Sequence, residues 1–383
     1  MTTTIERTYA RKVSQIERGY LNAASQGTHQ LIQTVVEGVG EIDPVAVREA
    51  IRIATAASPG LAVVRRGPVW RAGGPLPAVV VHPAGSGLPS GALGSDIDVV
   101  RGPVCEVHLV PGPVTRLVVR VSHVVTDGRG LQQWLADVFR VLRGEEPVGA
   151  PAVVDDTHFR AAAGTVPPAP APARVAGFPA ILGAGPSGPT PLWVRRTVPG
   201  SPSGVTARVA AAISRHLRGD AGRLIVPVDL RRHDRTVRST ANLSAQLLLD
   251  LRRGDDWRRV HRELLGAMLR KREVARLAGD FRRSNPFANT LAEAQEHTDD
   301  RFPCTAIVSD HGPVHLERYH APGFRPVRFY TLPMLVPYAE MFVSSCQTGD
   351  GTELTLSCRD RIGAREAAEA ILDDAAGLLT EIS

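Results

Sequence analysis

A stretch rich in proline, alanine and glycine divides this 383-residue chain near its middle. Over residues 161–191, "AAAGTVPPAPAPARVAGFPAILGAGPSGPTP", these residue types replace almost every charged side chain, which is typical of an extended connector or loop. The segments on either side, 1–160 and 192–383, each mix strand and helix patterns. Because the chain is longer than a single core usually supports, we expect two halves that share an interface.

The first segment predicts two helices and a hairpin. Asp43 as N-cap and Pro44 at the first helical position predict a helix over "IDPVAVREAIRIATAAS". The runs "VCEVHLV" and "VTRLVVRVS" are rich in β-branched residues and are separated by Pro111-Gly112-Pro113, which predicts an antiparallel hairpin. Apolar residues then recur at helical spacing in "LQQWLADVFRVL".

The second segment also mixes helices and strands. It predicts a helix over "SGVTARVAAAISRHL", a strand "RLIVPVDL", a long basic helix from about Asp256 to Arg276, and a strand near "CTAIVS". A hairpin of "MFVSSCQ" and "ELTLSC" across "TGDG" precedes an alanine-rich helix from Ala364 to Leu379. The basic helix has one apolar face, formed by Trp257, Val260, Leu264 and Met268. Both halves are therefore predicted as mixed α/β.

One histidine stands out in "VVRVSHVVTDGRGLQQWL", residues 118–135. His123 directly follows a predicted strand, which holds its backbone while the ring can point past the sheet edge. An imidazole of ordinary pKa near 6.5 is mostly neutral at pH 7 and can accept a proton. Asp127 can cap the next helix or pair with an arginine, and Gly128 permits a tight turn. From spacing alone, a core histidine with Asp127 as its cap is the more common outcome.

Other chemistries find less support in the sequence. His311, His315 and His320 are near one another, but Gly312-Pro313 breaks the helical spacing that would aim two rings at one metal ion, so we expect no metal site. The chain has no GxSxG elbow, no Walker A loop, and no GxGxxG between a strand and a helix.

Composition restricts the class of protein further. The formal net charge of +6 modestly favours anionic partners such as a phosphorylated cofactor or an acidic carrier protein, and nucleic acid is not expected because no basic run with interleaved aromatics occurs. The four cysteines show no CxxC spacing, which predicts buried free thiols in a reducing compartment. The start "MTTTIERTYARKVSQ" has no apolar signal core and no apolar run reaches about 18 residues, so we expect a cytoplasmic protein without a membrane span.

The residues around His123 resemble the HHxxxDG motif of the condensation-domain and chloramphenicol-acetyltransferase-like superfamily of acyl-thioester-dependent acyltransferases. The stretch "IDPVAVREAIRIATAASPGLAVVRRG" is similar to the first long helix and next strand of that family, and "GRGLQQWLADVFRVLRGEEP" to the helix after the motif. In the second half, "VPVDLRR", "ANLSAQLLLDL" and "TAIVSDHGPV" resemble later segments of the family, the last one its Ser-Asn-x-Gly strand end. The resemblance covers most of the chain, in order.

Two positions depart from the family pattern. Ser122 replaces the first histidine of the HH pair, which many acyltransferases of the superfamily also lack, and His123 keeps the place of the catalytic histidine. Asp310 stands where the family usually has asparagine, and no DFGWG segment is present. The group that stabilises the carbonyl oxygen therefore stays unassigned.

The resemblance implies a pseudo-dimer of two chloramphenicol-acetyltransferase-like halves, with a channel between them and His123 midway. It implies that His123 acts as general base or positions the acceptor, without a metal ion or a covalent acyl-enzyme. It makes Asp127 structural, paired with Arg231 or, alternatively, Arg232. Side chains that the resemblance places along the channel, although each also has an ordinary structural reading, are Ser122, Asn242, Ser309 and Tyr338.

The function implied is that of a stand-alone acyltransferase or condensation enzyme of specialised metabolism, such as nonribosomal peptide synthesis. The donor would be acyl-CoA or a phosphopantetheinyl carrier protein as co-substrate, the acceptor an alcohol or amine, and the enzyme a monomer without a permanently bound cofactor. One alternative is a non-catalytic module of the same fold that recruits carrier-tethered intermediates. Another is a cyclisation or bond rearrangement in the same channel.

Overall fold

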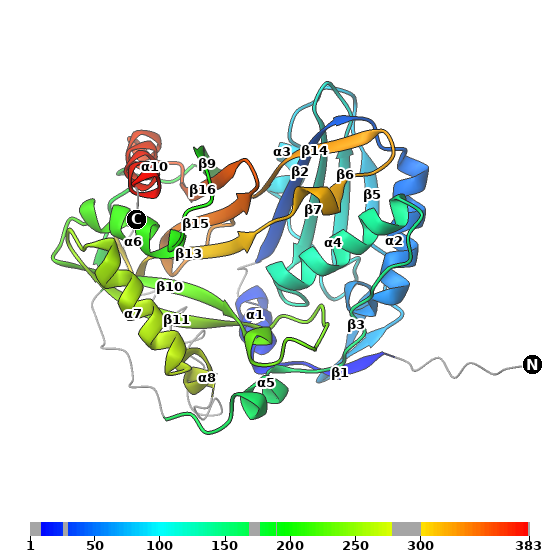
Figure 1. The fold of residues 1–383 in the computed structure, drawn as a ribbon, viewed down its shortest axis with the longest axis horizontal. Helices are drawn as coiled ribbons and strands as arrows, with labels where there is room; N and C mark the ends of the chain where they lie inside the picture. The colour runs from blue at the N-terminus through cyan, green and yellow to red at the C-terminus, as the bar shows by residue number, and fades with distance from the viewer. Residues whose placement is uncertain (1–8, 26–29, 168–176, 189, 278–299, 382–383) are drawn as a thin grey trace, which may run out of the picture.

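Two large sheets organise the structure into two lobes (Figure 1). The computed structural model describes residues 9–25, 30–167, 177–188, 190–277 and 300–381. The first sheet has the strand order β14-β2-β7-β6-β5 and the second the order β11-β10-β13-β15-β16-β9. The predicted mixed α/β fold with two halves is therefore confirmed.

The first lobe packs two helices against one face of its sheet (Figure 1). The apolar faces of α2 (Pro44–Ala57) and α4 (Gly128–Leu142) share one core with the inward residues of the sheet. Helix α2 begins as predicted, since the Asp43 carboxylate accepts the backbone N–H groups of Val45 and Ala46 at 2.9 and 3.3 Å. The strands of the sheet are β2 (Leu31–Gly40), β5 (Ala78–Val81), β6 (Cys105–Val110), β7 (Thr115–Ser122) and β14 (Phe324–Thr331). The hairpin β6–β7 is antiparallel, as predicted.

The second lobe packs α6 (Val205–Arg215) and α10 (Ala364–Thr380) against its sheet (Figure 1). The strands are β9 (Pro191–Pro199), β10 (Ala221–Asp229), β11 (Ser244–Arg252), β13 (Cys304–Pro313), β15 (Ala339–Thr348) and β16 (Gly351–Arg359). The predicted hairpin β15–β16 is present, and β13 runs parallel to both β10 and β15. Parallel neighbours bring the carboxyl ends of β10 and β13 to the same edge of the sheet.

Smaller elements complete the chain. They are β1 (Ala10–Lys12), α1 (Gln15–Ser25), η1 (Pro59–Leu61), β3 (Val63–Arg66), β4 (Val69–Ala72), α3 (Ser90–Leu93), α5 (Asp156–Ala163), β8 (Phe178–Pro179), η2 (Leu230–His233), α7 (Trp257–Leu269), α8 (Arg272–Leu277), β12 (Arg301–Phe302) and η3 (Leu316–Tyr319). All four cysteines are buried and free, as predicted. No helix among the described residues combines the length and apolarity that crossing a membrane demands.

Two predictions about local structure were wrong. The basic helix expected from Asp256 to Arg276 is broken into α7 and α8, because Lys271 between them adopts a left-handed φ of 52°. Its apolar face is otherwise as expected, with Trp257, Val260 and Leu264 buried and Met268 half-buried. The connector expected over 161–191 also contains regular structure: it begins inside α5 and includes β8, which pairs with β12. Its residues 168–176 and 189 lie outside the described residues.

The chain crosses the expected division in both directions. Strand β14 belongs to the segment 192–383, yet it pairs antiparallel with β2 at the edge of the first sheet. An unpaired edge strand exposes a row of backbone N–H and C=O groups, and β14 satisfies those of β2. In the opposite direction, Ala23 of α1 packs into a core of the second lobe with Ile225 and Ile307. The two lobes are therefore joined by exchanged segments as well as by surface contact.

The crossing of β14 depends on a close approach at Gly38. A Cβ atom there would lie 2.4 Å from the Phe324 ring and 2.6 Å from the carbonyl oxygen of Arg325. Gly38→Ala should therefore lower the free energy of unfolding by about 1–3 kcal/mol, measured by urea denaturation. The control is Gly377→Ala in α10, where no atom lies within 4 Å of the new Cβ and stability should rise by up to about 1 kcal/mol. Equal effects of the two substitutions would contradict this account.

Candidate active site between the lobes

His123 follows β7 directly and lines a cavity of about 140 Å³ whose walls come from both lobes. The first lobe contributes residues of β2 and the start of α4, and the second lobe contributes residues of β10, β13 and β15. His123 is half-buried and belongs to the lining of this cavity, so it is not sealed within the core of one lobe. The structure thus places His123 at the junction of the lobes.

Three neighbours hold the histidine in place. The backbone N–H of His123 donates to the carbonyl oxygen of Gln30 at 2.8 Å. The Asn242 amide nitrogen donates to the His123 carbonyl oxygen at 2.5 Å and lies 3.0 Å from the ring Nδ1. The Tyr20 ring stacks on the imidazole with centroids 4.5 Å apart, and its hydroxyl lies 3.5 Å from Nε2. An imidazole held in this way keeps one position relative to the cavity.

Burial also sets the protonation state of this ring. Desolvation lowers the pKa of His123 below its ordinary value of 6.5, although the Asp127 carboxylate acts in the opposite direction. His123 is therefore neutral at pH 7 and carries one ring nitrogen that can accept a proton.

Asp127 both caps α4 and forms an ion pair across the lobes, so the two roles considered from the sequence coexist. Its carboxylate accepts the backbone N–H of Gly130 at 2.8 Å and that of Leu243 at 2.6 Å. The Arg231 guanidinium lies 2.9 Å from Asp127 Oδ2, and the two side chains are only 6% and 4% exposed. Although burial opposes ionisation, Arg231 and the N–H donors hold the pKa of Asp127 below its usual value. The alternative partner, Arg232, pairs instead with Glu273 at 2.8 Å.

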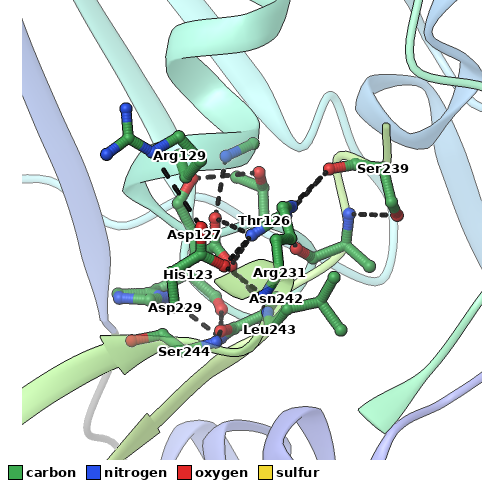
Figure 2. A network of polar contacts seen from close by, with 12 residues as sticks. His123, Thr126, Asp127, Arg129, Asp229, Arg231, Ser239, Asn242, Leu243 and Ser244 are labelled. Carbon is green, nitrogen blue, oxygen red and sulfur yellow. Dashed lines mark hydrogen bonds and ion pairs between the residues drawn. The ribbon is translucent and has the colours of Figure 1, made fainter. Parts of the chain in front are cut away.

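Arg231 lies at the centre of a larger network (Figure 2). Its guanidinium also donates to Asp229 at 2.7 Å, to the carbonyl oxygen of Ser239 at 2.8 and 3.2 Å, and to that of Ala241 at 2.9 Å. These backbone contacts fix the course of the chain from η2 to β11. That course carries Asn242 to His123, so Arg231 positions a neighbour of the histidine without touching it.

The two glycines after Asp127 allow close contact between the lobes. A Cβ at Gly128 would lie 2.7 Å from Cε1 of His311 on β13. A Cβ at Gly130 would lie 2.7 Å from Thr126 Oγ1 and 2.8 Å from the carbonyl oxygen of Thr240. The glycines are therefore needed less for their own backbone angles than for the absence of a side chain.

Of the other residues predicted to line the channel, some line the cavity and others do not. Ser309 and Tyr338 line the cavity. Asn242 lies behind the histidine ring and is buried. Ser122 does not face the cavity, because its hydroxyl accepts the backbone N–H of Val124 inside the turn. Asp310 lines the cavity and accepts hydrogen bonds from the Ser345 hydroxyl at 2.8 Å and the Gly312 N–H at 2.9 Å.

Sequence reasoning missed Tyr20 and the residues that bridge the lobes beside the cavity. Gln132 Nε2 lies 3.4 Å from His311 Nδ1, and Arg129 contacts both Gln132 Oε1 at 3.2 Å and the His311 carbonyl oxygen at 3.4 Å. Burial lowers the pKa of His311 to about 4, so this ring is neutral. The strand end at His311 was a usable signal, because β10 and β13 are parallel and end at one edge. Tyr20 had no such signal in the sequence.

His311, His315 and His320 are close together in the sequence but do not form one group of ligands in the structure. The part of the chain that the structure describes contains no group of three or more histidine, cysteine or acidic side chains arranged to hold a metal ion. His315 lies beside the Glu317 carboxylate at 3.3 Å, and His320 contacts the Glu317 carbonyl oxygen at 2.9 Å. His315 and His320 therefore contact different groups of Glu317, whereas His311 contacts Gln132.

Solved structures with a similar fold include several condensation domains. That of the monacolin K polyketide synthase is 12% identical over 97% of this chain and 96% of its own, with a TM-score of 0.67. A variant of the starter condensation domain of rhizomide synthetase, in complex with C8-CoA and Leu-SNAC, is 13% identical over 97% and 95%, with a TM-score of 0.64. The first condensation domain of the calcium-dependent antibiotic synthetase, in complex with a substrate analogue, is 14% identical over 98% and 96%, with a TM-score of 0.65.

The likeness lies in the fold. No family model matches the sequence, and no curated protein matches it. The chain has the condensation-domain fold along almost its whole length, which confirms the pseudo-dimer architecture that the resemblance implied.

The ion pair across the lobes generates a stability prediction. Replacing Arg231 with Met leaves the buried Asp127 carboxylate without its counter-charge, so the free energy of unfolding should fall by about 3–5 kcal/mol in urea denaturation. The matched control is Arg235→Met, an exposed arginine of the same loop, which should change it by less than about 0.5 kcal/mol. If Arg231→Met were as stable as the control, the pair would not hold the lobes together.

Proposed function

We propose that this protein transfers an acyl group from a thioester donor to an amine or hydroxyl acceptor, with His123 at the reaction centre. The donor is acyl-CoA or an acylated phosphopantetheinyl carrier protein, and the product is an amide or ester. The observation that carries the proposal is the position of a neutral histidine on the wall of a cavity that both lobes enclose. A domain of the same fold crystallised with C8-CoA and Leu-SNAC supports a thioester donor and an aminoacyl acceptor.

The reaction needs little beyond what the site contains. The acceptor nitrogen or oxygen attacks the thioester carbonyl carbon, the C–S bond breaks, and the thiol leaves. Neutral His123 accepts the proton that the acceptor loses and returns it to the departing sulfur. In the second role that the residues allow, His123 holds the acceptor by a hydrogen bond in the attacking geometry. Tyr20 and Asn242 keep the ring oriented in either case.

The lining of the His123 cavity supports a proposal about how the donor binds. Ser309 and Tyr338 supply polar groups on a mixed wall, whose apolar part includes Ile225, Ile307 and Phe342. The apolar part of this lining suits an acyl chain, and its polar groups can hydrogen-bond to the donor and the acceptor near the thioester. We further propose that the enzyme acts as a cytoplasmic monomer without a resident cofactor.

A second candidate function is a non-catalytic module that recruits carrier-tethered intermediates. The full set of contacts around His123 favours catalysis, because a docking module has no need of an oriented neutral histidine. Cyclisation or bond rearrangement in the same cavity would use the same ring, and product analysis distinguishes it from acyl transfer.

Removing the imidazole tests the proposal. His123→Ala should lower kcat by at least about 100-fold, since general acid–base groups contribute 10²–10⁴-fold. Turnover is followed as thiol release from an acyl-CoA or acyl-N-acetylcysteamine donor with an amine or alcohol acceptor, and thermal unfolding shows whether the variant is folded. His261→Gln, on α7 and outside the cavity lining, is the matched control and should keep wild-type turnover. A wild-type protein that binds an acylated carrier without turnover would establish the recruiting module instead.

The lowered pKa of His123 predicts a pH profile. Since burial favours the neutral ring, kcat/KM should stay level as the pH falls from 8 and decline only below pH 6.5, the ordinary value for histidine. Tyr20→Ala removes the stacked ring and lets water reach the imidazole, so the decline should move to higher pH. A wild-type profile that declines above pH 6.5, or one that Tyr20→Ala leaves in place, would contradict a desolvated base.

A further inference from the structure

A second cavity, of about 360 Å³, adjoins the first and is lined by an unusual number of arginines. Arg129 and Gln132 belong to the walls of both cavities. We call this space the arginine cavity; its charged lining side chains are Arg129, Arg140, Arg143, Arg238, Arg318 and Asp137. Five guanidinium groups against one carboxylate leave four positive charges in excess in this lining.

The acidic groups near the arginine cavity are already engaged. Both oxygens of Asp137 accept backbone N–H groups, from Val148 at 3.0 Å and Gly149 at 2.8 Å. Glu145 and Asp229 lie outside the lining: Glu145 is 3.0 Å from Arg140 and 2.7 Å from Arg143, and Asp229 is 4.0 Å from Arg129, which together offset two of the four excess charges. The cavity therefore keeps a positive excess that a bound anion would balance.

The arginines differ in how freely they can take a ligand. Arg143 is fixed by hydrogen bonds to the carbonyl oxygens of Arg318 and His320 at 3.1 and 3.0 Å. Arg238 donates to the carbonyl oxygen of Gly149 at 2.7 Å. Arg318 is exposed, and no hydrogen bond or ion pair of its guanidinium occurs within the described ranges. Its five N–H donors remain free to meet an anion.

The wall between the cavities is the bridge of Arg129, Gln132 and His311. Strand β13 runs along both spaces, lining the first at His311 and the second at Pro313. The contacts of the bridge are 3.2–3.4 Å long, so they are weak and cost little to open. A slender chain that displaced the Gln132–His311 contact would pass from the arginine cavity toward His123.

We propose that the arginine cavity binds the phosphate of the pantetheine arm that carries the acyl thioester. This inference rests on the proposed function, because both CoA and a phosphopantetheinyl carrier hold their thiol at the end of a long flexible arm with a phosphate at its other end. Guanidinium groups bind phosphate oxygens through paired, charge-assisted hydrogen bonds, which fits a site built from arginine rather than lysine. The phosphate is held outside the bridge while the thioester reaches the cavity of His123.

Binding of four probes to the wild-type protein tests the inference without any turnover. Pantetheine, 4′-phosphopantetheine, dephospho-CoA and CoA are compared by titration calorimetry. The three phosphorylated probes should bind at least about tenfold more tightly than pantetheine, and raising the salt concentration to 1 M should reduce that difference. Equal affinities for pantetheine and 4′-phosphopantetheine would overturn the proposal.

Variants of Arg318 locate the site. Arg318→Glu should abolish the preference for phosphorylated probes, and Arg318→Lys should retain part of it because the charge remains. The control is Arg71→Glu, an exposed arginine of β4 in neither lining, which should keep the preference. Thermal unfolding shows that each variant is folded. If the double variant Arg318→Glu/Arg140→Gln still preferred the phosphorylated probes, the assignment of the phosphate site to the arginine cavity would be wrong.

Donor kinetics then identify the source of the phosphate and separate the two proposals. Acyl-N-acetylcysteamine has no phosphate and serves as the reference donor. For each phosphate-containing donor, acyl-CoA or acylated carrier, kcat/KM is divided by kcat/KM for the reference. Arg318→Glu should lower this ratio about tenfold for the true donor. No turnover of any donor by the wild type, with phosphate-dependent binding intact, would overturn the proposed function alone. Arg318→Glu could also weaken turnover of the acylated carrier while binding of free 4′-phosphopantetheine stays unchanged and free 4′-phosphopantetheine does not compete with the carrier. That result would mean that the arginines dock an acidic protein surface, contrary to the inference.

Discussion

A single buried guanidinium links the two lobes beside His123 and helps to fix how they meet. Arg231 follows β10 of the second lobe and pairs with Asp127, the N-cap of α4 in the first. A buried ion pair adds little net stability compared with a well-packed apolar pair, but an unpaired charge in its place is costly. The pair therefore selects one relative position of the lobes and penalises the others. The cavity of His123 exists only in that position, because both lobes supply its walls.

The surroundings of His123 are assembled from segments that are distant in sequence. Tyr20 and Asn242 contact His123 across 103 and 119 residues of chain, and His311 packs against Gly128. A further buried network supports this assembly: Arg11 pairs with Glu17 and donates to the carbonyl oxygen of Val125, just after His123. The N-terminal segment thereby stabilises the turn that carries the histidine. Position and protonation state of the ring are both consequences of packing, since desolvation keeps it neutral.

Much of the fold could be predicted because its signals are local. The Asp43 cap, the apolar spacing of α4 and the β-branched runs of β6 and β7 depend on neighbours within a few residues. The break between α7 and α8 and the crossing of β14 could not be predicted in this way. A left-handed Lys271 conflicts with its own propensity, and β14 is placed by the free edge of a strand almost 300 positions earlier in the chain.

The sequence by itself determined the strand–turn–helix unit that presents His123 and Asp127, because backbone hydrogen bonding and apolar periodicity act over short distances. It also placed Gly128 and Gly130 after Asp127, where no side chain obstructs the approach of the second lobe. Only the tertiary structure decided that Tyr20, Asn242 and His311 surround the histidine, that Ser122 faces away, and that five arginines gather around one cavity. The reason is physical: these contacts follow from the docking of two sheets, and no local pattern encodes which distant side chains that docking brings together.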